Sequence, residues 1–147
     1  MPSRQTKGPT RWKIYLDGDG ERAMQRLRFG QGILMLGAAR PSARLRLLAR
    51  NRGLTIAQEG HRTAVRVHNL PELRRALLDQ TPLVFLSPLY PTRTHPGWQP
   101  VPRMRAAAYA WLGHRRLLAL GGMTDARFRR VRPLGFQAWA GISAFRT

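Results

Sequence analysis

Two glycine-containing turns near the C-terminus have the residue types that bind phosphate. Gly121 and Gly122 follow a short apolar run, and Thr124 can cap a helix that begins directly after them. Glycines let backbone N–H groups approach an anion closely, and a helix N-terminus favours negative charge. The next apolar run ends in a similar turn, formed by Gly141, Ile142 and Ser143. Each turn alone is also typical of an ordinary strand-to-helix connection, so the hypothesis of a phosphate site depends on the pair.

A proline-stiffened loop over residues 87–95 is the second candidate site. It carries hydroxyl groups and cations that could hold a polar heterocycle or a second phosphate: Ser87, Tyr90, Thr92, Thr94, Arg93 and His95. The alternative is a surface connection rich in turn-forming residues. Because prolines and threonines are concentrated in so few positions, we favour a ligand-binding loop.

His68 is the candidate catalytic residue. It ends a predicted strand directly before a predicted helix, and a histidine there can act as a general acid or base near neutral pH. For this residue taken alone, a structural histidine with satisfied hydrogen bonds is the alternative. His61 and His114 have no motif around them, and we interpret them as structural or surface residues.

Metal ligands are scarce in this sequence. The chain has no cysteine and only 7 acidic residues. Asp17 and Glu59 are the only carboxylates placed to reach the ends of predicted strands. A magnesium–pyrophosphate site normally uses one or two carboxylates, so such a site could be built but is not indicated. We therefore predict no metal ligand.

The elements that would position these residues alternate between strand and helix. Short apolar runs without polar alternation are typical of strands buried on both faces of a parallel sheet. We predict strands at 13–17, 32–36, 54–57, 63–67, 82–86, 116–120 and 136–142. We predict helices at 21–29, 41–51, 71–79, 101–112 and 124–131. In α/β barrels the site lies where the strands end, so the residues above would meet at one end of the sheet.

The predicted fold class is α/β, with about seven mostly parallel strands. A complete (β/α)₈ barrel typically has about 250 residues, and about 200 is near its lower end. At 147 residues, the chain predicts a shortened TIM-type barrel that is incompletely closed or is completed by a partner, so a homodimer is one option. We expect a flexible basic tail over 1–11 and a single domain over 12–147.

The net charge of +19 comes almost entirely from arginine. An arginine-rich module that binds RNA or another polyanion is therefore the alternative function. The arginines are scattered over nearly every predicted helix, without interleaved aromatic residues or a known RNA-binding signature, so we expect only non-specific binding of nucleic acid. No apolar run is long enough to span a bilayer and no secretory signal is present, so we expect a cytoplasmic protein without a membrane partner.

From residue 63 onward, the motifs together resemble the thiamin phosphate synthase/TenI family. The resemblance is carried in order by segments 67–73, 87–92, 119–123 and 140–144. It implies a (β/α)₈ barrel in which the synthase joins a pyrimidine pyrophosphate to a thiazole phosphate with Mg²⁺. The TenI branch isomerises the thiazole phosphate with a histidine that falls at His68. By position, the phosphate ligands would be Gly122, Ile142 and Ser143, with Thr92 and Thr94 contacting the ligand from the loop.

The part of the synthase site that binds Mg²⁺ and pyrophosphate differs here. The second predicted strand lacks the family's cationic set, with Arg40 the nearest cation, and the third ends in Ala57 and Gln58 instead of Asn-Asp. One strand and one helix are missing, and His95 replaces a loop lysine. Departing pyrophosphate develops charge that metal and cations must stabilise. The resemblance therefore favours a tautomerase-like or non-catalytic protein of thiamin biosynthesis or salvage that binds thiazole phosphate or thiamin phosphate; Mg²⁺ is implied only if synthase activity is retained.

Overall fold

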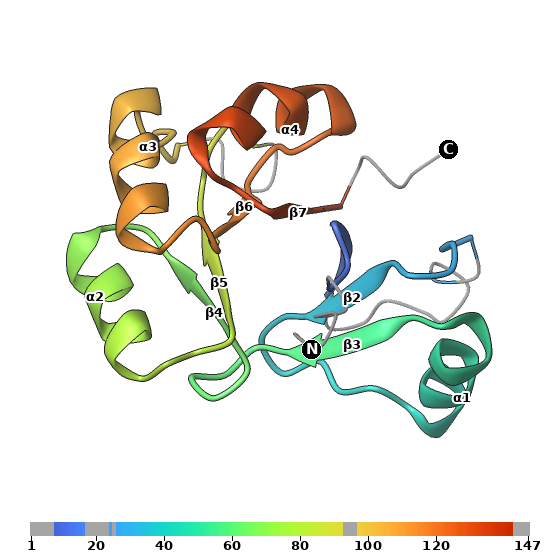
Figure 1. Ribbon diagram of the computed structural model, residues 1–147. Helices are drawn as coiled ribbons and strands as arrows, with labels where there is room; N and C mark the ends of the chain where they lie inside the picture. The colour runs from blue at the N-terminus through green and yellow to red at the C-terminus, as the bar shows by residue number, and fades with distance from the viewer. Residues whose placement is uncertain (1–7, 17–23, 25, 93–96, 143–147) are drawn as a thin grey trace, which may run out of the picture.

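The computed structural model describes residues 8–16, 24, 26–92 and 97–142, and strands and helices alternate along most of this chain (Figure 1). The described residues form strands β1 (Arg11–Tyr15), β2 (Gly32–Met35), β3 (Thr55–Gln58), β4 (Ala64–Val67), β5 (Leu83–Leu86), β6 (Leu118–Leu120) and β7 (Ala138–Gly141). The helices are α1 (Ala43–Arg52), α2 (Leu70–Leu78), α3 (Arg103–Leu112) and α4 (Asp125–Val131), followed by the 3₁₀-helix η2 (Arg132–Leu134). None of the described helices is long and apolar enough to cross a membrane.

The strands form one parallel sheet in the order β3-β2-β1-β7-β6-β5-β4. β7 lies at its centre, and β1 pairs with it on one side, so that Trp12 of β1 is in register with Ala140 of β7 and with Gly32 of β2. The sheet curves into a nearly closed barrel with helices outside it, which confirms the predicted shortened TIM-type fold. All strands run in the same direction, so their C-terminal ends lie at one mouth of the barrel.

The barrel remains open between β3 and β4, the two outermost strands. These strands are consecutive in the sequence and are joined by residues 59–63 without an intervening helix. Two isolated bridges, from Glu59 and Gly60 to Ala64, connect the end of β3 to the start of β4. β4 therefore begins beside the end of β3 and does not run alongside it.

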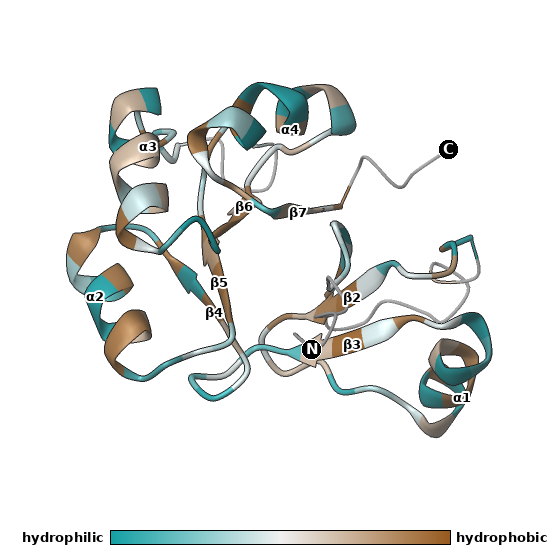
Figure 2. Ribbon diagram, viewed as in Figure 1, coloured by the Kyte–Doolittle hydropathy of each residue, from teal (hydrophilic) through white to brown (hydrophobic). Residues whose placement is uncertain are grey.

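The core has an inner and an outer layer because alternate strand residues face opposite sides of the sheet. The inner layer fills the barrel and contains Trp12 and Phe85, whose rings meet edge to face at 6.3 Å. Two outer clusters pack the strands against the helices, one beneath α1 and the other beneath α2, α3 and α4. Figure 2 shows β2 and β5 mainly hydrophobic and the outer surface of α1 mainly hydrophilic.

Side-chain caps determine where three of the helices begin. Ser42, Asn69 and Thr124 each accept a hydrogen bond from a backbone N–H in the first turn of the following helix. Such caps satisfy N–H groups that have no partner within the helix. The predicted helix over 21–29 is wrong at its C-terminal end, because residues 26–29 form turns and irregular backbone. The rest of that prediction falls mainly outside the described residues.

Candidate functional site

His68 follows the last residue of β4 and lies exposed at the C-terminal mouth of the barrel. Its Nδ1 atom is 2.8 Å from the main-chain oxygen of Ser87. A carbonyl oxygen can only accept a hydrogen bond, so Nδ1 carries the proton and donates it. In the neutral ring, Nε2 therefore has the free lone pair of a base.

The start of α2 holds the main chain of His68 in place. The backbone N–H of His68 donates to Glu72 Oε2 at 2.8 Å, and the N–H of Glu72 donates to Asn69 Oδ1 at 2.9 Å. Asn69 and Glu72 have the spacing of a capping box, and this pair differs from the usual form because the Glu72 side chain reaches back one residue further, to His68. The same residues therefore cap α2 and hold the backbone of His68 in position.

Trp98 is a site residue that the sequence analysis missed. Its ring meets the His68 imidazole edge to face, with 5.4 Å between ring centroids and 75° between planes. The side chain of Trp98 is 45% exposed, which leaves an apolar surface open next to a titratable ring. The available signal was a large aromatic residue in a Pro- and Gly-rich loop, where no core position requires one.

The structure places Ser87 beside His68, as a buried residue whose backbone makes the contact. Its N–H donates to Val67 O at 3.0 Å, and its carbonyl accepts from the histidine ring. A cis peptide bond joins it to Pro88. Thr92 is partly buried near the end of the described loop, and Thr94 and His95 lie outside the described residues.

The turn at Gly121 and Gly122 packs tightly against the loop that follows Ser87. The N–H of Tyr90 donates to Gly121 O at 3.2 Å. Both glycines have positive φ angles, +101° and +62°, and added Cβ atoms would lie 2.6 Å from Pro88 Cα and 2.5 Å from Pro91 O. Close packing therefore requires glycine at both positions, whether or not an anion binds there.

Arg127 brings a cation to this turn and is the second site residue that was missed. Its Nη1 donates to Gly122 O at 2.6 Å, and its guanidinium lies over the Tyr90 ring, 4.8 Å from the centroid. A planar cation held in this way is preorganised for a phosphate oxygen, since fewer rotamers are lost on binding. A helical arginine in an arginine-rich chain gave no sequence signal that distinguished it from its neighbours.

The second predicted phosphate turn, at the end of β7, is also close-packed. A Cβ atom on Gly141 would lie 2.9 Å from the Trp139 ring. The main-chain oxygen of Ile142 accepts a hydrogen bond from the buried Lys13 Nζ at 3.1 Å. Ser143 lies outside the described residues. The two glycine turns thus lie at the ends of the neighbouring strands β6 and β7.

The carboxylate of Glu59 is occupied by hydrogen bonds. Its Oε2 lies 2.5 Å from Arg66 Nε, and its Oε1 accepts from the N–H of Gly37 at 3.2 Å. Arg40, the cation that follows the second strand in the sequence, donates to the carbonyl oxygen of Ala39 at 3.0 Å. Glu59 therefore does not fit a magnesium ligand, and the described residues contain no group of three or more potential metal ligands. Asp17 lies outside the described residues.

No protein-family model matches the chain, and no curated protein matches it significantly. Solved structures do resemble it. A thiamine phosphate pyrophosphorylase from Pyrococcus furiosus superposes with a TM-score of 0.72 at 13% identity, over 92% of this chain and 86% of that chain. The chain has the fold of that protein. A thiamine phosphate pyrophosphorylase from Bacteroides thetaiotaomicron gives a TM-score of 0.60, also at 13% identity, over 92% of this chain and 83% of that chain. At this identity the likeness establishes the barrel fold alone.

Proposed function

We propose that the chain binds a thiazole phosphate or thiamin phosphate at the C-terminal mouth of the barrel and isomerises the thiazole ring with His68 as the proton carrier. The observation that carries this proposal is the 2.8 Å contact between His68 Nδ1 and Ser87 O. It leaves Nε2 free as a base at the mouth where barrels of this class bind ligands. The fold shared with two thiamine phosphate pyrophosphorylases and the motifs of the sequence support the choice of ligand.

The reaction would be a proton transfer within the thiazole ring. Nε2 removes a proton from one ring carbon, and the electron pair of the broken C–H bond forms a new double bond to the next atom. The neighbouring double bond moves along by one position. The imidazolium then returns the proton at the other end of the shifted bond, so that atoms and charge balance. The carbonyl of Ser87 stabilises the imidazolium, because its hydrogen bond strengthens when the ring becomes positive.

The heterocycle and the phosphate of the ligand would bind at two different sides of the mouth. Trp98 offers an apolar face beside His68 for a flat heterocycle. Gly121, Gly122, Gly141 and the segment after it are the proposed phosphate side, where Arg127 adds a fixed positive charge. The occupied carboxylate of Glu59 is the reason that we favour isomerisation over a metal-dependent synthase reaction.

Calorimetry and an isomerisation assay test the proposal together. We expect saturable binding of thiazole phosphate and conversion of a carboxythiazole phosphate isomer followed by NMR. His68→Ala should abolish turnover and retain binding, whereas His61→Ala, an exposed histidine outside the site, should leave both unchanged. Binding without turnover in the wild type would favour a non-catalytic phosphate-binding protein, and absence of binding would refute the proposal.

A further inference from the structure

The wall of the barrel is open along β3. One edge of β3 pairs with β2, whereas the other pairs with no strand in the described part of the chain. The bridges to Ala64 begin only at Glu59, one residue beyond the end of β3. The whole length of Thr55–Gln58 therefore lies at an open sheet edge.

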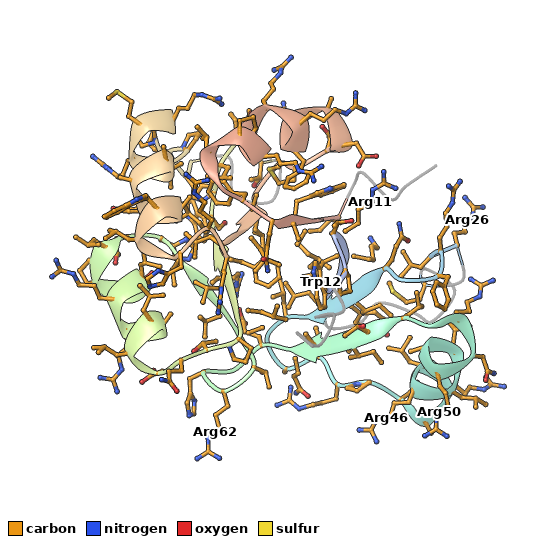
Figure 3. The ribbon with its side chains drawn as sticks, viewed as in Figure 1. Arg11, Trp12, Arg26, Arg46, Arg50 and Arg62 are labelled. Carbon is orange, nitrogen blue, oxygen red and sulfur yellow. The ribbon has the colours of Figure 1, made fainter. Side chains whose placement is uncertain are left out.

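A groove of about 490 Å³ occupies this gap. All four residues of β3 line one side, Thr63 and Leu83 line the other, and the buried Trp12 contributes to the lining. Pro41 and Pro82 also line it, together with Arg46 and Arg62. In Figure 3 the two arginine side chains extend outward from α1 and from the connection before β4. The groove shares no residue with the mouth that contains His68.

The backbone of β3 presents unused hydrogen-bonding groups to the groove. The N–H groups of Thr55 and Glu59 donate to Gln31 O and Met35 O on the β2 side, at 3.1 and 2.9 Å. In a parallel ladder alternate residues bond to the same neighbour, so Ile56 and Gln58 direct their N–H and C=O groups to the opposite edge. The carbonyl of Gln58 accepts from the Thr63 hydroxyl. The N–H and C=O of Ile56 and the N–H of Gln58 thus form an edge that an added strand can use.

We propose that this groove binds an extended acidic peptide segment, which adds to β3 as a further strand. Arg46 and Arg62 lie on the lining, and no acidic residue does. Glu59, the carboxylate that directly follows β3, already pairs with Arg66. The four residues of β3 span about 13 Å. The part of the peptide that pairs with β3 is therefore roughly four residues long.

Charge and surface chemistry distinguish this occupant from two others. A second copy of the chain would bring another net charge of +19 to the same basic surface, which disfavours self-association. Single-stranded RNA is bound by stacking on exposed aromatic rings, whereas the only aromatic residue of the lining, Trp12, is 2% exposed. An acidic peptide satisfies both the cations and the backbone edge.

A labelled peptide of six residues, in which glutamate and valine alternate, tests the proposal. Its binding is measured by fluorescence anisotropy at physiological ionic strength. We expect saturable binding, weakened roughly tenfold or more when the peptide backbone is N-methylated at the pairing positions, since charge is kept and N–H donors are lost. Arg46→Glu with Arg62→Glu should abolish binding. Arg74→Glu with Arg129→Glu makes the same change of charge on exposed faces of α2 and α4 and should have little effect.

A backbone variant gives a second, independent measurement. Ile56→Pro removes the N–H that faces the groove and leaves the hydrogen bonds to β2, so it should weaken peptide binding while circular dichroism remains unchanged. If this variant fails to fold, the N-methylated peptide still decides. Three results would overturn the proposal. The first is equal affinity for the parent and the methylated peptide, and the second is an equal loss of peptide affinity in the two double arginine variants. The third is tighter binding of a single-stranded RNA of equal charge.

Discussion

Arg66 and Glu59 form an ion pair across the opening of the barrel, with 2.5 Å between Nε and Oε2. Arg66 belongs to β4, and Glu59 follows β3, so the pair joins the two strands that lack a ladder between them. Both side chains are less than one third exposed, at 31% and 22%. The pair therefore replaces part of the missing strand–strand contact, and it also occupies the carboxylate that follows the end of β3.

Breaking this pair should destabilise the fold. Glu59→Gln leaves the Arg66 guanidinium without its partner in a partly buried place, and we expect a loss of about 1–3 kcal/mol in the free energy of unfolding. Urea denaturation measures it. Asp79→Asn, which removes the ion pair with the 78% exposed side chain of Arg75, is the control and should cost under about 0.5 kcal/mol. Equal losses in the two variants would argue against a structural role for the barrel pair.

Gly121→Ala should be among the more harmful single changes in the chain. It would force a side chain into a φ of +101° and place Cβ 2.6 Å from the Pro88 backbone, so we expect a loss of about 2 kcal/mol or more. Thermal unfolding measures the effect. Gly97→Ala is the control, because a Cβ there meets no atom within 4 Å. A neutral Gly121→Ala would show that the loop and the turn are not packed as described.

Glu72→Ala should affect both α2 and His68. The variant removes the acceptor of the His68 N–H and one half of the helix cap, and we expect a loss of about 1 kcal/mol in stability together with reduced turnover in the isomerisation assay. Glu72→Gln keeps an acceptor oxygen and should restore most of both. If the two variants lose stability and turnover equally, the hydrogen bond from the His68 N–H to residue 72 does not account for either effect.

Arg127→Ala should weaken binding of the phosphorylated ligand roughly tenfold, because it removes a guanidinium fixed by Gly122 O and the Tyr90 ring. Calorimetry with thiazole phosphate measures the change. Arg129→Ala, an exposed arginine of the same helix, removes the same charge without that support and should leave the affinity nearly unchanged. A uniform loss in both would indicate general electrostatic attraction in place of a built site.

Local patterns in the sequence determined the elements and their class. Continuous apolar runs such as 32–36 predicted buried parallel strands, and the residues that cap α1, α2 and α4 act within one helical turn, so they could be identified from neighbouring residues. The number of strands in so short a chain predicted a shortened barrel, which the structure confirms. The position of His68 at a strand end directly before a helix could also be predicted, because it is a local feature.

Contacts between distant segments were decided only by the tertiary structure. The partner of His68 is the backbone oxygen of Ser87, and main-chain groups carry no residue-specific signal in the sequence. Trp98 and Arg127 join the candidate site through spatial proximity alone, and the Glu59 carboxylate is paired with an arginine that the barrel brings to it. The open edge of β3 likewise depends on how far β4 is displaced along the barrel. Side-chain types and local spacing thus predicted the elements, whereas closure of the sheet determined which groups meet.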